Sequence, residues 1–359
     1  MRRGVVLMKM KVLIVFGGVS SEHDVSLVSA RSVINNIPAD KYDVLTMGIT
    51  KEGVSYLYTG SPDNLPEGKW LENPEYLERC VISPDREHHG IIHIGSGETE
   101  RVDVVFPVLH GKNGEDGTMQ GLLEISGIPF VGCKTAASAV CMDKSLTNAL
   151  LDYHKVSQAK WVAVNKFDFT GEKEKFAREA ADYLGFPIFV KPANAGSSVG
   201  IRKASDIESL VDACDYAFEF DKKIVLEENI TGAEVECAVL GNDEPIASTV
   251  GEIVPCNDFY DYDAKYIANA TGLYIPARLP DEKIEEIRQK AVRIYKLLGC
   301  SGLTRVDFFV RESDGEVMLN ELNTIPGFTS ISMYPKLFAA SGIEYPELID
   351  RLILYALEN

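Results

Sequence analysis

Short apolar runs alternate with segments of helical periodicity in the first third of the chain. Residues 10–16 form an apolar strand that enters the Gly17–Gly18 turn, and the pattern over 21–37 predicts a helix after it. Two further buried strands are predicted at 102–109 and 128–131. This alternation predicts an α/β domain with a largely parallel sheet.

The rest of the chain mixes helices with antiparallel patterns. The clearest helix covers 281–298, where apolar residues recur on one face and Gly299 follows the last turn. Two apolar strands within 304–323 flank Ser313-Asp314-Gly315 and predict a β-hairpin. The other expected elements are a helix at 134–154, a polar helix at 172–184, strands at 186–192, 223–228 and 233–240, an irregular segment at 252–280 and a last helix at 346–357.

Length and charge narrow the class of protein. A chain of 359 residues exceeds the roughly 250–300 residues at which a single core stops growing, so two or three domains are expected. Lys plus Arg number 36 against 54 Asp plus Glu, a net charge of −18 that argues against nucleic acid as a general partner. No apolar run approaches the roughly 20 residues of a membrane span, so we expect no membrane partner.

The seven cysteines are scattered and contain no CxxC pair, which is typical of reduced thiols and predicts a cytoplasmic protein. Lys9 and Lys11 interrupt the apolar N-terminal stretch, so residues 1–9 are interpreted as an overhang and not as a signal peptide.

One loop carries the chemistry that phosphate binding needs. Lys191 ends a predicted strand, and residues 196–200 (GSSVG) supply two glycines, two hydroxyls and a run of backbone N–H groups. Gly/Ser loops are also common as plain turns, so this motif alone leaves both interpretations open. No GxxxxGK[ST] motif occurs, and GSGETE at 95–100 lacks the third glycine of a dinucleotide fingerprint and is interpreted as a polar hairpin turn.

Acidic residues stand among apolar ones in the 304–323 hairpin. Glu321 and Asn323 are two residues apart and therefore project from one face of their strand. A two-residue Asp-Gly loop would put Asp307 on the other face, whereas a three-residue Ser-Asp-Gly loop would place Asp307 opposite Glu321 and Arg305 opposite Asn323. Such hard oxygen ligands suit Mg²⁺ held with nucleotide phosphates. The alternative is a solvated strand face with an Arg–Asp salt bridge.

Together these segments resemble the ATP-grasp superfamily and, within it, the D-alanine–D-alanine ligases. The resemblance covers nearly the whole chain past residue 10, with the motifs in the family's order. The matching motifs are FGGVSSEHDVSLVSA (16–30), VFPVLHGKNGEDGTMQGLLE (105–124), CMDK (141–144), VKPANAGSSVG (190–200), FYDYDAKY (259–266), RVDFFV (305–310) and LNELNTIPGFTSISMYP (319–335).

The resemblance implies a three-domain α/β ATP-grasp fold with an α+β lid. Its expected parts are a Rossmann-like N-terminal domain that binds the first D-alanine (1–132), a central lid (133–227) and a C-terminal domain with the metal and catalytic residues (228–359). The implied reaction is ATP-dependent joining of two D-alanine molecules through an acyl phosphate, a step of peptidoglycan precursor synthesis. A homodimer is implied by resemblance alone.

Most nucleotide contacts are implied by position in the family's motifs. Lys144 and Lys191 resemble the pair that holds the α- and β-phosphates, and Lys265 would reach the γ-phosphate. The other implied ATP contacts are Ser197 and Ser198 in the phosphate loop, Glu227, Glu228 and Ile230 at the adenine, and Glu234 at the ribose. Asp307, Glu321 and Asn323 resemble the ligands of two Mg²⁺ or Mn²⁺ ions, and K⁺ is a family possibility.

The catalytic roles are also implied by the resemblance. Arg305 would stabilise the acyl phosphate and the tetrahedral intermediate, and the Gly327 N–H would complete an oxyanion hole. Glu22 would hold the ammonium of the first D-alanine, whereas without the resemblance it is an ordinary acid at a helix start. Ser197 and Tyr266 would hydrogen-bond with Glu22. Tyr260 would line the loop over the site, and His110 would approach the first substrate's carboxylate.

The identity of the second substrate is a separate question. Tyr266 favours an amine acceptor over the hydroxyl of D-lactate, and Ser332 and Met333 would line the acceptor pocket. An apolar Met333 suits a methyl side chain, although such a pocket rejects an added hydroxyl by only about 100-fold. Asn113 resembles the D-alanine–D-serine branch, so that ligase activity is the alternative. A different ATP-grasp ligase and a catalytically inactive nucleotide-binding module are disfavoured, because both sets of D-alanine motifs and all metal positions are filled.

Overall fold

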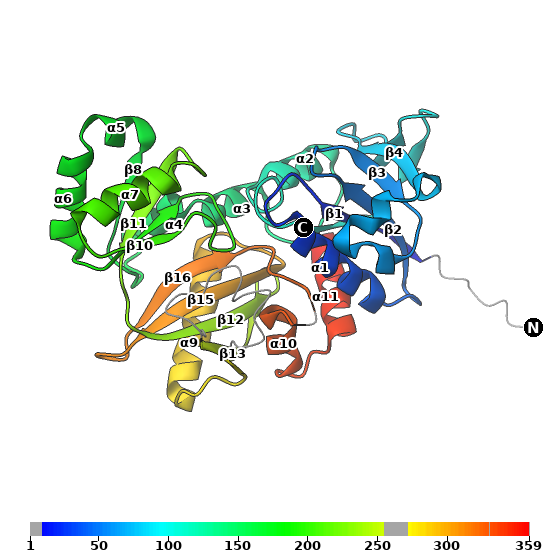
Figure 1. Cartoon of the computed structure of the whole chain (residues 1–359). Coiled ribbons are helices and arrows are strands. Elements are labelled where there is room, and N and C mark those ends of the chain that lie inside the picture. The colour runs from blue at the N-terminus through cyan, green and yellow to red at the C-terminus, as the bar shows by residue number, and fades with distance from the viewer. Residues whose placement is uncertain (1–8, 255–271, 330, 359) are drawn as a thin grey trace, which may run out of the picture. The chain divides into compact units, whose positions relative to one another are not determined.

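The computed structural model describes residues 9–254, 272–329 and 331–358. Its strands form three sheets, and the chain divides into two compact units (Figure 1). The first unit contains residues 1–135, 301–303 and 325–359, and the second contains 136–300 and 304–324. Within the described residues, no helix combines the length and the apolar character that crossing a bilayer requires.

A seven-stranded sheet in the order β6-β5-β4-β3-β2-β1-β7 forms the centre of the first unit. Strand β1 (Met10–Gly17) is almost wholly apolar and pairs in parallel with β2 (Tyr42–Ile49) and β7 (Val104–Val108). The other strands of this unit are β3 (Ser55–Tyr58), β4 (Leu77–Ile82), β5 (Gly90–His93) and β6 (Thr99–Arg101), its α-helices are α1 (His23–Asn36), α2 (Thr118–Ser126), α10 (Met333–Ala339) and α11 (Tyr345–Leu357), and its 3₁₀ turns are η1 (Pro62–Asn64), η2 (Pro66–Leu71) and η3 (Pro74–Tyr76).

The prediction of a largely parallel sheet is wrong for most of these strands. Strands β2 to β6 pair in antiparallel fashion, since short connections link them along the chain. The prediction of a hairpin turn at 95–100 is confirmed, because the segment joins antiparallel β5 and β6. Helix α11 belongs to this unit because it packs on β7 and α1, and Lys41 and Tyr42 both bond to its Asp350 at 2.7 Å.

A four-stranded sheet in the order β10-β9-β11-β8 opens the second unit. Helices α6 and α7 cover one face of it and bury a core of small, aliphatic and aromatic residues (Figure 1). The elements of this part are α3 (Thr135–Met142), α4 (Lys144–Tyr153), β8 (Trp161–Asn165), α5 (Lys166–Gly171), α6 (Lys173–Leu184), β9 (Ile188–Pro192), β10 (Arg202–Ala204), α7 (Ile207–Ala217) and β11 (Lys223–Glu228).

The single helix predicted at 134–154 is in fact two helices. The Asp143 side chain accepts hydrogen bonds from the backbone N–H groups of Ser145 and Leu146 at 3.0 and 3.2 Å and so starts α4 as an N-cap. The chain therefore breaks its helix directly before Lys144, one of the predicted nucleotide contacts.

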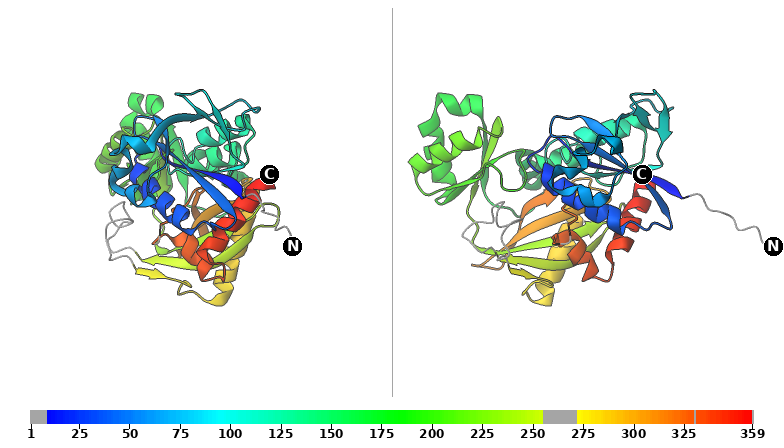
Figure 2. Two further views of the ribbon diagram at one scale, coloured as in Figure 1. Left: turned by 90° about the vertical axis from the view of Figure 1, so that its right-hand side faces the viewer. Right: turned by 45° about the vertical axis from the view of Figure 1, so that its right-hand side comes forward.

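A five-stranded sheet in the order β14-β13-β12-β15-β16 completes the second unit, and α9 packs against its β12 and β13 (Figure 2). The predicted helix at 281–298 is confirmed, with Ile287, Ala291 and Ile294 buried along one face. Strand β13 runs to Val254, so the predicted irregular segment begins too early. The elements are β12 (Gly232–Leu240), β13 (Ile246–Val254), β14 (Gly272–Tyr274), α9 (Asp281–Leu297), β15 (Leu303–Arg311) and β16 (Val317–Asn323).

The predicted pairing in the β15–β16 hairpin is confirmed, but its expected cause is wrong. Arg305 lies opposite Asn323 and Asp307 opposite Glu321. Nearer the turn, Val310 faces Val317, a register that implies a four-residue loop and not the three-residue one. The two registers differ because Asn320 has no partner in the ladder and forms a bulge.

Candidate functional site

A cavity of about 550 Å³ lies within the second unit, bounded by residues of its two sheets. This volume falls in the ~300–1,000 Å³ range of small-molecule sites. Its lining includes most of the predicted nucleotide contacts, namely Lys144, Lys191, Ser197, Ser198, Glu227, Glu228, Ile230 and Glu234, together with the predicted metal ligand Glu321. The structure therefore brings together residues that are far apart in the sequence.

Two of the lysines predicted to contact phosphates line this cavity. Lys191 extends from β9, and its Nζ lies 2.6 Å from Oε2 of Glu227 on the neighbouring strand β11. Burial lowers the pKa of Lys191, but the nearby carboxylates, Glu227 first, outweigh this effect and hold its pKa above the ordinary value. Lys144 Nζ donates to the Ala195 carbonyl at 2.8 Å and so ties α4 to the glycine-rich loop.

The glycine-rich loop has an unusual backbone. Ser197 and Ser198 have φ values of +49° and +58°, in the left-handed region that non-glycine residues rarely adopt. Consecutive residues of this kind cost on the order of 1 kcal/mol or more each and concentrate at functional sites. The strain fits a loop whose backbone N–H groups are shaped to surround a ligand.

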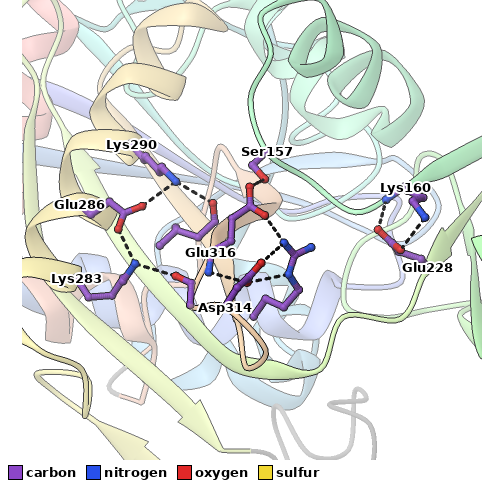
Figure 3. A network of polar contacts seen from close by, with 11 residues as sticks. Ser157, Lys160, Glu228, Lys283, Glu286, Lys290, Asp314 and Glu316 are labelled. Carbon is purple, nitrogen blue, oxygen red and sulfur yellow. Dashed lines mark hydrogen bonds and ion pairs between the residues drawn. The ribbon is translucent and has the colours of Figure 1, made fainter.

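Part of the cavity lining is apolar and suits an aromatic base. Phe189, Ile201 and Phe309 contribute apolar lining, and Glu228 and Ile230 line the same cavity. The Glu228 carboxylate accepts from the Lys160 backbone N–H at 2.8 Å (Figure 3). Glu227 accepts from Asn148 Nδ2 at 3.4 Å as well as pairing with Lys191, so its orientation is fixed from two sides.

Arg305 is held between two carboxylates. Its Nε and Nη2 donate to the two oxygens of Asp307 at 2.8 and 2.7 Å, and Nε lies 3.1 Å from Oε2 of Glu236. Burial lowers the pKa of Arg305, yet Asp307 and Glu236 overcome it, so the pKa is raised well above the ordinary value. The guanidinium is therefore a fixed, fully charged group. The Arg–Asp salt bridge considered from the sequence is present, but it is buried and not solvated.

The hairpin residues fit a divalent cation. Asp307 and Glu321 are cross-strand neighbours, and the Oδ1 of Asn323 is buried without a hydrogen-bond partner among the described residues. An unsatisfied buried acceptor beside two carboxylates is costly unless a cation is bound. Within the described part of the chain, His, Cys, Asp and Glu form no group of three or more that could hold a metal. The set here contains two acids, with the asparagine oxygen as third donor.

A second group of predicted residues lies in the first unit. His110 follows β7; its Nδ1 lies 2.9 Å from the Ile325 carbonyl and its Nε2 lies 3.0 Å from Ser29 Oγ. Burial lowers the pKa of His110, although Glu22 and the Ile325 carbonyl oppose the shift. Glu22 directly precedes α1 and is itself buried. These two side chains therefore occupy fixed, buried positions.

The turn that carries Gly327 is held by the same unit. The Phe328 N–H points at Ser29 Oγ at 3.4 Å, and the Ile325 N–H donates to Glu115 Oε1 at 3.2 Å. On the other side of Gly327, Ser332 Oγ accepts from the Thr329 N–H at 3.0 Å, and Met333 is buried at the start of α10. The turn is therefore anchored at both ends.

Ser29 and Glu115 were not singled out from the sequence, although both lie inside quoted motifs. The signal available was their place in VSLVSA and HGKNGEDG, where a buried serine and acid stand beside the predicted site residues. Three predicted residues, Tyr260, Lys265 and Tyr266, lie outside the described residues. The predicted hydrogen bonds of Ser197 and Tyr266 with Glu22 stay a prediction.

The family models described as D-ala D-ala ligase N-terminus and C-terminus match residues 11–133 and 150–354. A D-alanine–D-alanine ligase of Caldicellulosiruptor bescii is 51% identical over 98% of this chain and 96% of its own, and one of Clostridium acetobutylicum is 49% identical over 96% and 97%.

Solved structures give the same result. The D-Ala:D-Ser ligase VanG of Enterococcus faecalis has a TM-score of 0.89 at 43% identity, over 97% of this chain and 100% of that one. The D-alanine–D-alanine ligase of Coxiella burnetii has a TM-score of 0.84 at 33% identity, over 98% and 96%.

Proposed function

Because the chain belongs to the D-alanine–D-alanine ligase family, with the ATP-grasp fold, we propose that it joins two D-alanine molecules to D-alanyl-D-alanine with cleavage of ATP to ADP and phosphate. The product would enter peptidoglycan precursor synthesis. The observation that carries the proposal is the 550 Å³ cavity, in which two lysines and a glycine-rich loop stand with Glu321 of the carboxylate hairpin.

The nucleotide would lie in this cavity, with its base between apolar side chains and its phosphates at Lys144 and Lys191. The loop N–H groups around Ser197 and Ser198 would contact the phosphate oxygens, and Glu234 would contact the ribose. Lys265 would reach the γ-phosphate. These residues orient the γ-phosphate toward the attacking carboxylate of D-alanine, and much of catalysis in such a transfer is positioning.

The hairpin would supply the remaining charge. Asp307, Glu321 and Asn323 would hold two Mg²⁺ ions. When bound, these ions would neutralise charge on the phosphoryl group. Arg305 keeps its charge at every accessible pH and would face the oxygen on which negative charge develops.

The first unit would hold the D-alanine substrates. Glu22 would accept the ammonium of the first D-alanine, His110 would lie near its carboxylate, and the Gly327 N–H would donate to the oxyanion. Ser29 and Glu115 would keep the Gly327 turn in place. The chain would divide into three domains, with boundaries at residues 132 and 227. It would act in the cytoplasm as a homodimer.

D-serine is the alternative acceptor. The structural match to a D-Ala:D-Ser ligase and Asn113, which adopts φ +64° in the HGKNGEDG loop, favour it. The buried, apolar Met333 favours D-alanine, and we choose D-alanine for this reason. Tyr266 favours an amine acceptor, which both D-alanine and D-serine provide, over D-lactate.

Product mass spectrometry tests the proposal. The protein is incubated with ATP, Mg²⁺ and D-alanine, alone and with an equal concentration of D-serine or D-lactate. D-alanyl-D-alanine as the main product of every mixture is expected. D-alanyl-D-serine as the main product would assign the chain to the alternative, and the absence of any dipeptide would reject both.

A further inference from the structure

A second, smaller cavity in the second unit shares no lining residue with the nucleotide pocket. It measures about 130 Å³ and lies between α9, the β15–β16 hairpin and the segment that follows α4. Its lining residues are Lys155, Val156, Ser157, Lys290, Arg293, Ile294, Phe308, Val317 and Leu319. Three of the nine are cations and none is an acid, in a chain where acidic residues outnumber basic ones by 54 to 36.

The carboxylates that contact these lining residues are already engaged. Glu286 pairs with Lys290 at 2.9 Å and with Lys283 at 2.7 Å (Figure 3). Glu316 accepts from Ser157 Oγ at 2.5 Å and also pairs with Arg311. Neither acid is therefore available to neutralise further positive charge in the cavity.

Within the part of the chain that the structure describes, two of the three cations have no acidic partner. Across the described ranges, neither Lys155 nor Arg293 forms an ion pair with a carboxylate, and the Arg293 side chain reaches only the His154 carbonyl at 3.5 Å. Arg293 lies in α9 before its last turn, so the dipole of that helix does not account for it. The cavity thus has two exposed cations that no carboxylate of the described residues pairs with.

The backbone conformation at Lys155 supports the same interpretation. Its φ is +54°, and its N–H bonds to the Asp152 carbonyl where α4 ends. Glycine or asparagine is usual at this place because a side chain is strained there. A cation just beyond the C-terminal end of a helix also interacts favourably with the helix dipole, and this interaction stabilises Lys155 at its position. The helix dipole does not, however, require the side chain to line a cavity with Lys290 and Arg293.

The floor of the cavity is apolar and comes from the hairpin. Phe308, Val317 and Leu319 line it, whereas Phe309 and Glu321 of the same strands line the nucleotide pocket. Its volume is well below the ~300 Å³ of a typical drug-sized site, so only a small molecule fits. We infer that this cavity binds a short-chain monocarboxylate, with the carboxylate at Lys155 and Arg293 and the alkyl part on the hairpin floor.

Fluorine NMR with 4,4,4-trifluorobutyrate tests this inference on the full chain. The titration is run with Mg²⁺ and a saturating non-hydrolysable ATP analogue, and without D-alanine, whose own carboxylate would compete for the cavity. We expect saturable binding that the double variant Lys155→Gln/Arg293→Gln weakens at least about tenfold, because both charges that face the carboxylate are removed. Both side chains are exposed, so the variant should fold.

Two matched variants complete the test. Lys296→Gln removes an exposed charge from the same helix without touching the cavity and should leave the affinity unchanged. Arg293→Lys keeps the charge but not the planar guanidinium, so it should weaken binding less than the double variant does. Absence of saturable binding, or equal affinity in the double variant and in Lys296→Gln, would overturn the inference. The outcome is independent of the proposed ligase activity.

Discussion

Asp307 lies directly opposite Glu321 in the hairpin, although the loop that joins the two strands would by itself place it opposite Asn320. The bulge at Asn320 shifts the register by one residue and so brings the two carboxylates together. Because side chains alternate between the faces of a strand, a one-residue shift decides which face Glu321 occupies. The bulge therefore creates the proposed metal site.

Replacing Asp307 by Asn should remove a metal ligand with little change in volume. We expect ATP-dependent turnover to fall by about 100-fold or more, because charge stabilisation in the transition state is lost. Turnover measured over a range of Mg²⁺ concentrations should show a raised requirement. Arg305 keeps Glu236 as a partner at 3.1 Å, so the variant should remain folded. Near-normal activity at low Mg²⁺ would remove Asp307 from the metal site.

The Lys191–Glu227 pair should show different effects on stability and on nucleotide binding. Lys191→Met leaves Glu227 as a buried, unpaired charge, which typically costs about 3–5 kcal/mol in the free energy of unfolding. Adding Glu227→Gln should recover most of that stability, as measured by urea denaturation, but not the affinity for ATP. If the double variant bound ATP normally, Lys191 would have only a structural role.

Gly111 should be essential for the position of Glu22. A Cβ at residue 111 would lie 2.4 Å from Glu22 Oε2 and 2.7 Å from Ser20 Oγ, so Gly111→Ala must displace the carboxylate. We expect the KM for D-alanine to rise about tenfold, the effect of losing about 1.4 kcal/mol of binding.

Gly97→Ala is the matched control for this substitution. Gly97 has a similar φ of +75°, and nothing lies within 4 Å of the added atom. Gly97→Ala therefore introduces backbone strain without a steric clash. Equal KM values in the two variants would show that strain, and not Glu22, explains the effect.

Burial of His110 should make stability depend on pH. Its pKa is lowered in the folded state, so the unfolded chain binds more protons below its ordinary pKa of about 6.5. The contribution of His110 to the free energy of unfolding is therefore fully present above pH 6.5, and it decreases as the pH falls toward 5. Urea denaturation at several pH values should show a smaller decrease for His110→Gln, which cannot titrate. Identical pH slopes would contradict a buried neutral imidazole.

Local patterns in the sequence predicted the elements that depend on local chemistry. Helix α9 follows from its apolar period, and the hairpin follows from two apolar strands around Ser313-Asp314-Gly315. The bulge at Asn320 could not be predicted, because Leu319 next to it pairs with the distant segment 157–158. Long-range pairing of this kind leaves no signal in a short window of sequence.

The candidate site shows the same limit. The motifs identified Glu22, His110 and Lys191 by resemblance, but not the partners that fix them. Ser29 is an ordinary helix residue in the sequence, and its contact with His110 exists only because α1 packs beside the end of β7. Contacts that hold a functional side chain in place are set by packing between elements, which a linear motif does not record.

The central claim, ATP-driven activation of D-alanine through an acyl phosphate, is tested most directly with D-alanine labelled with ¹⁸O in its carboxyl group. The carboxylate oxygen that attacks the γ-phosphate stays with that phosphorus when the second D-alanine displaces phosphate. Mass spectrometry should therefore detect D-alanyl-D-alanine together with inorganic phosphate that carries one ¹⁸O atom. Unlabelled phosphate, or ATP cleavage without dipeptide, would contradict the account.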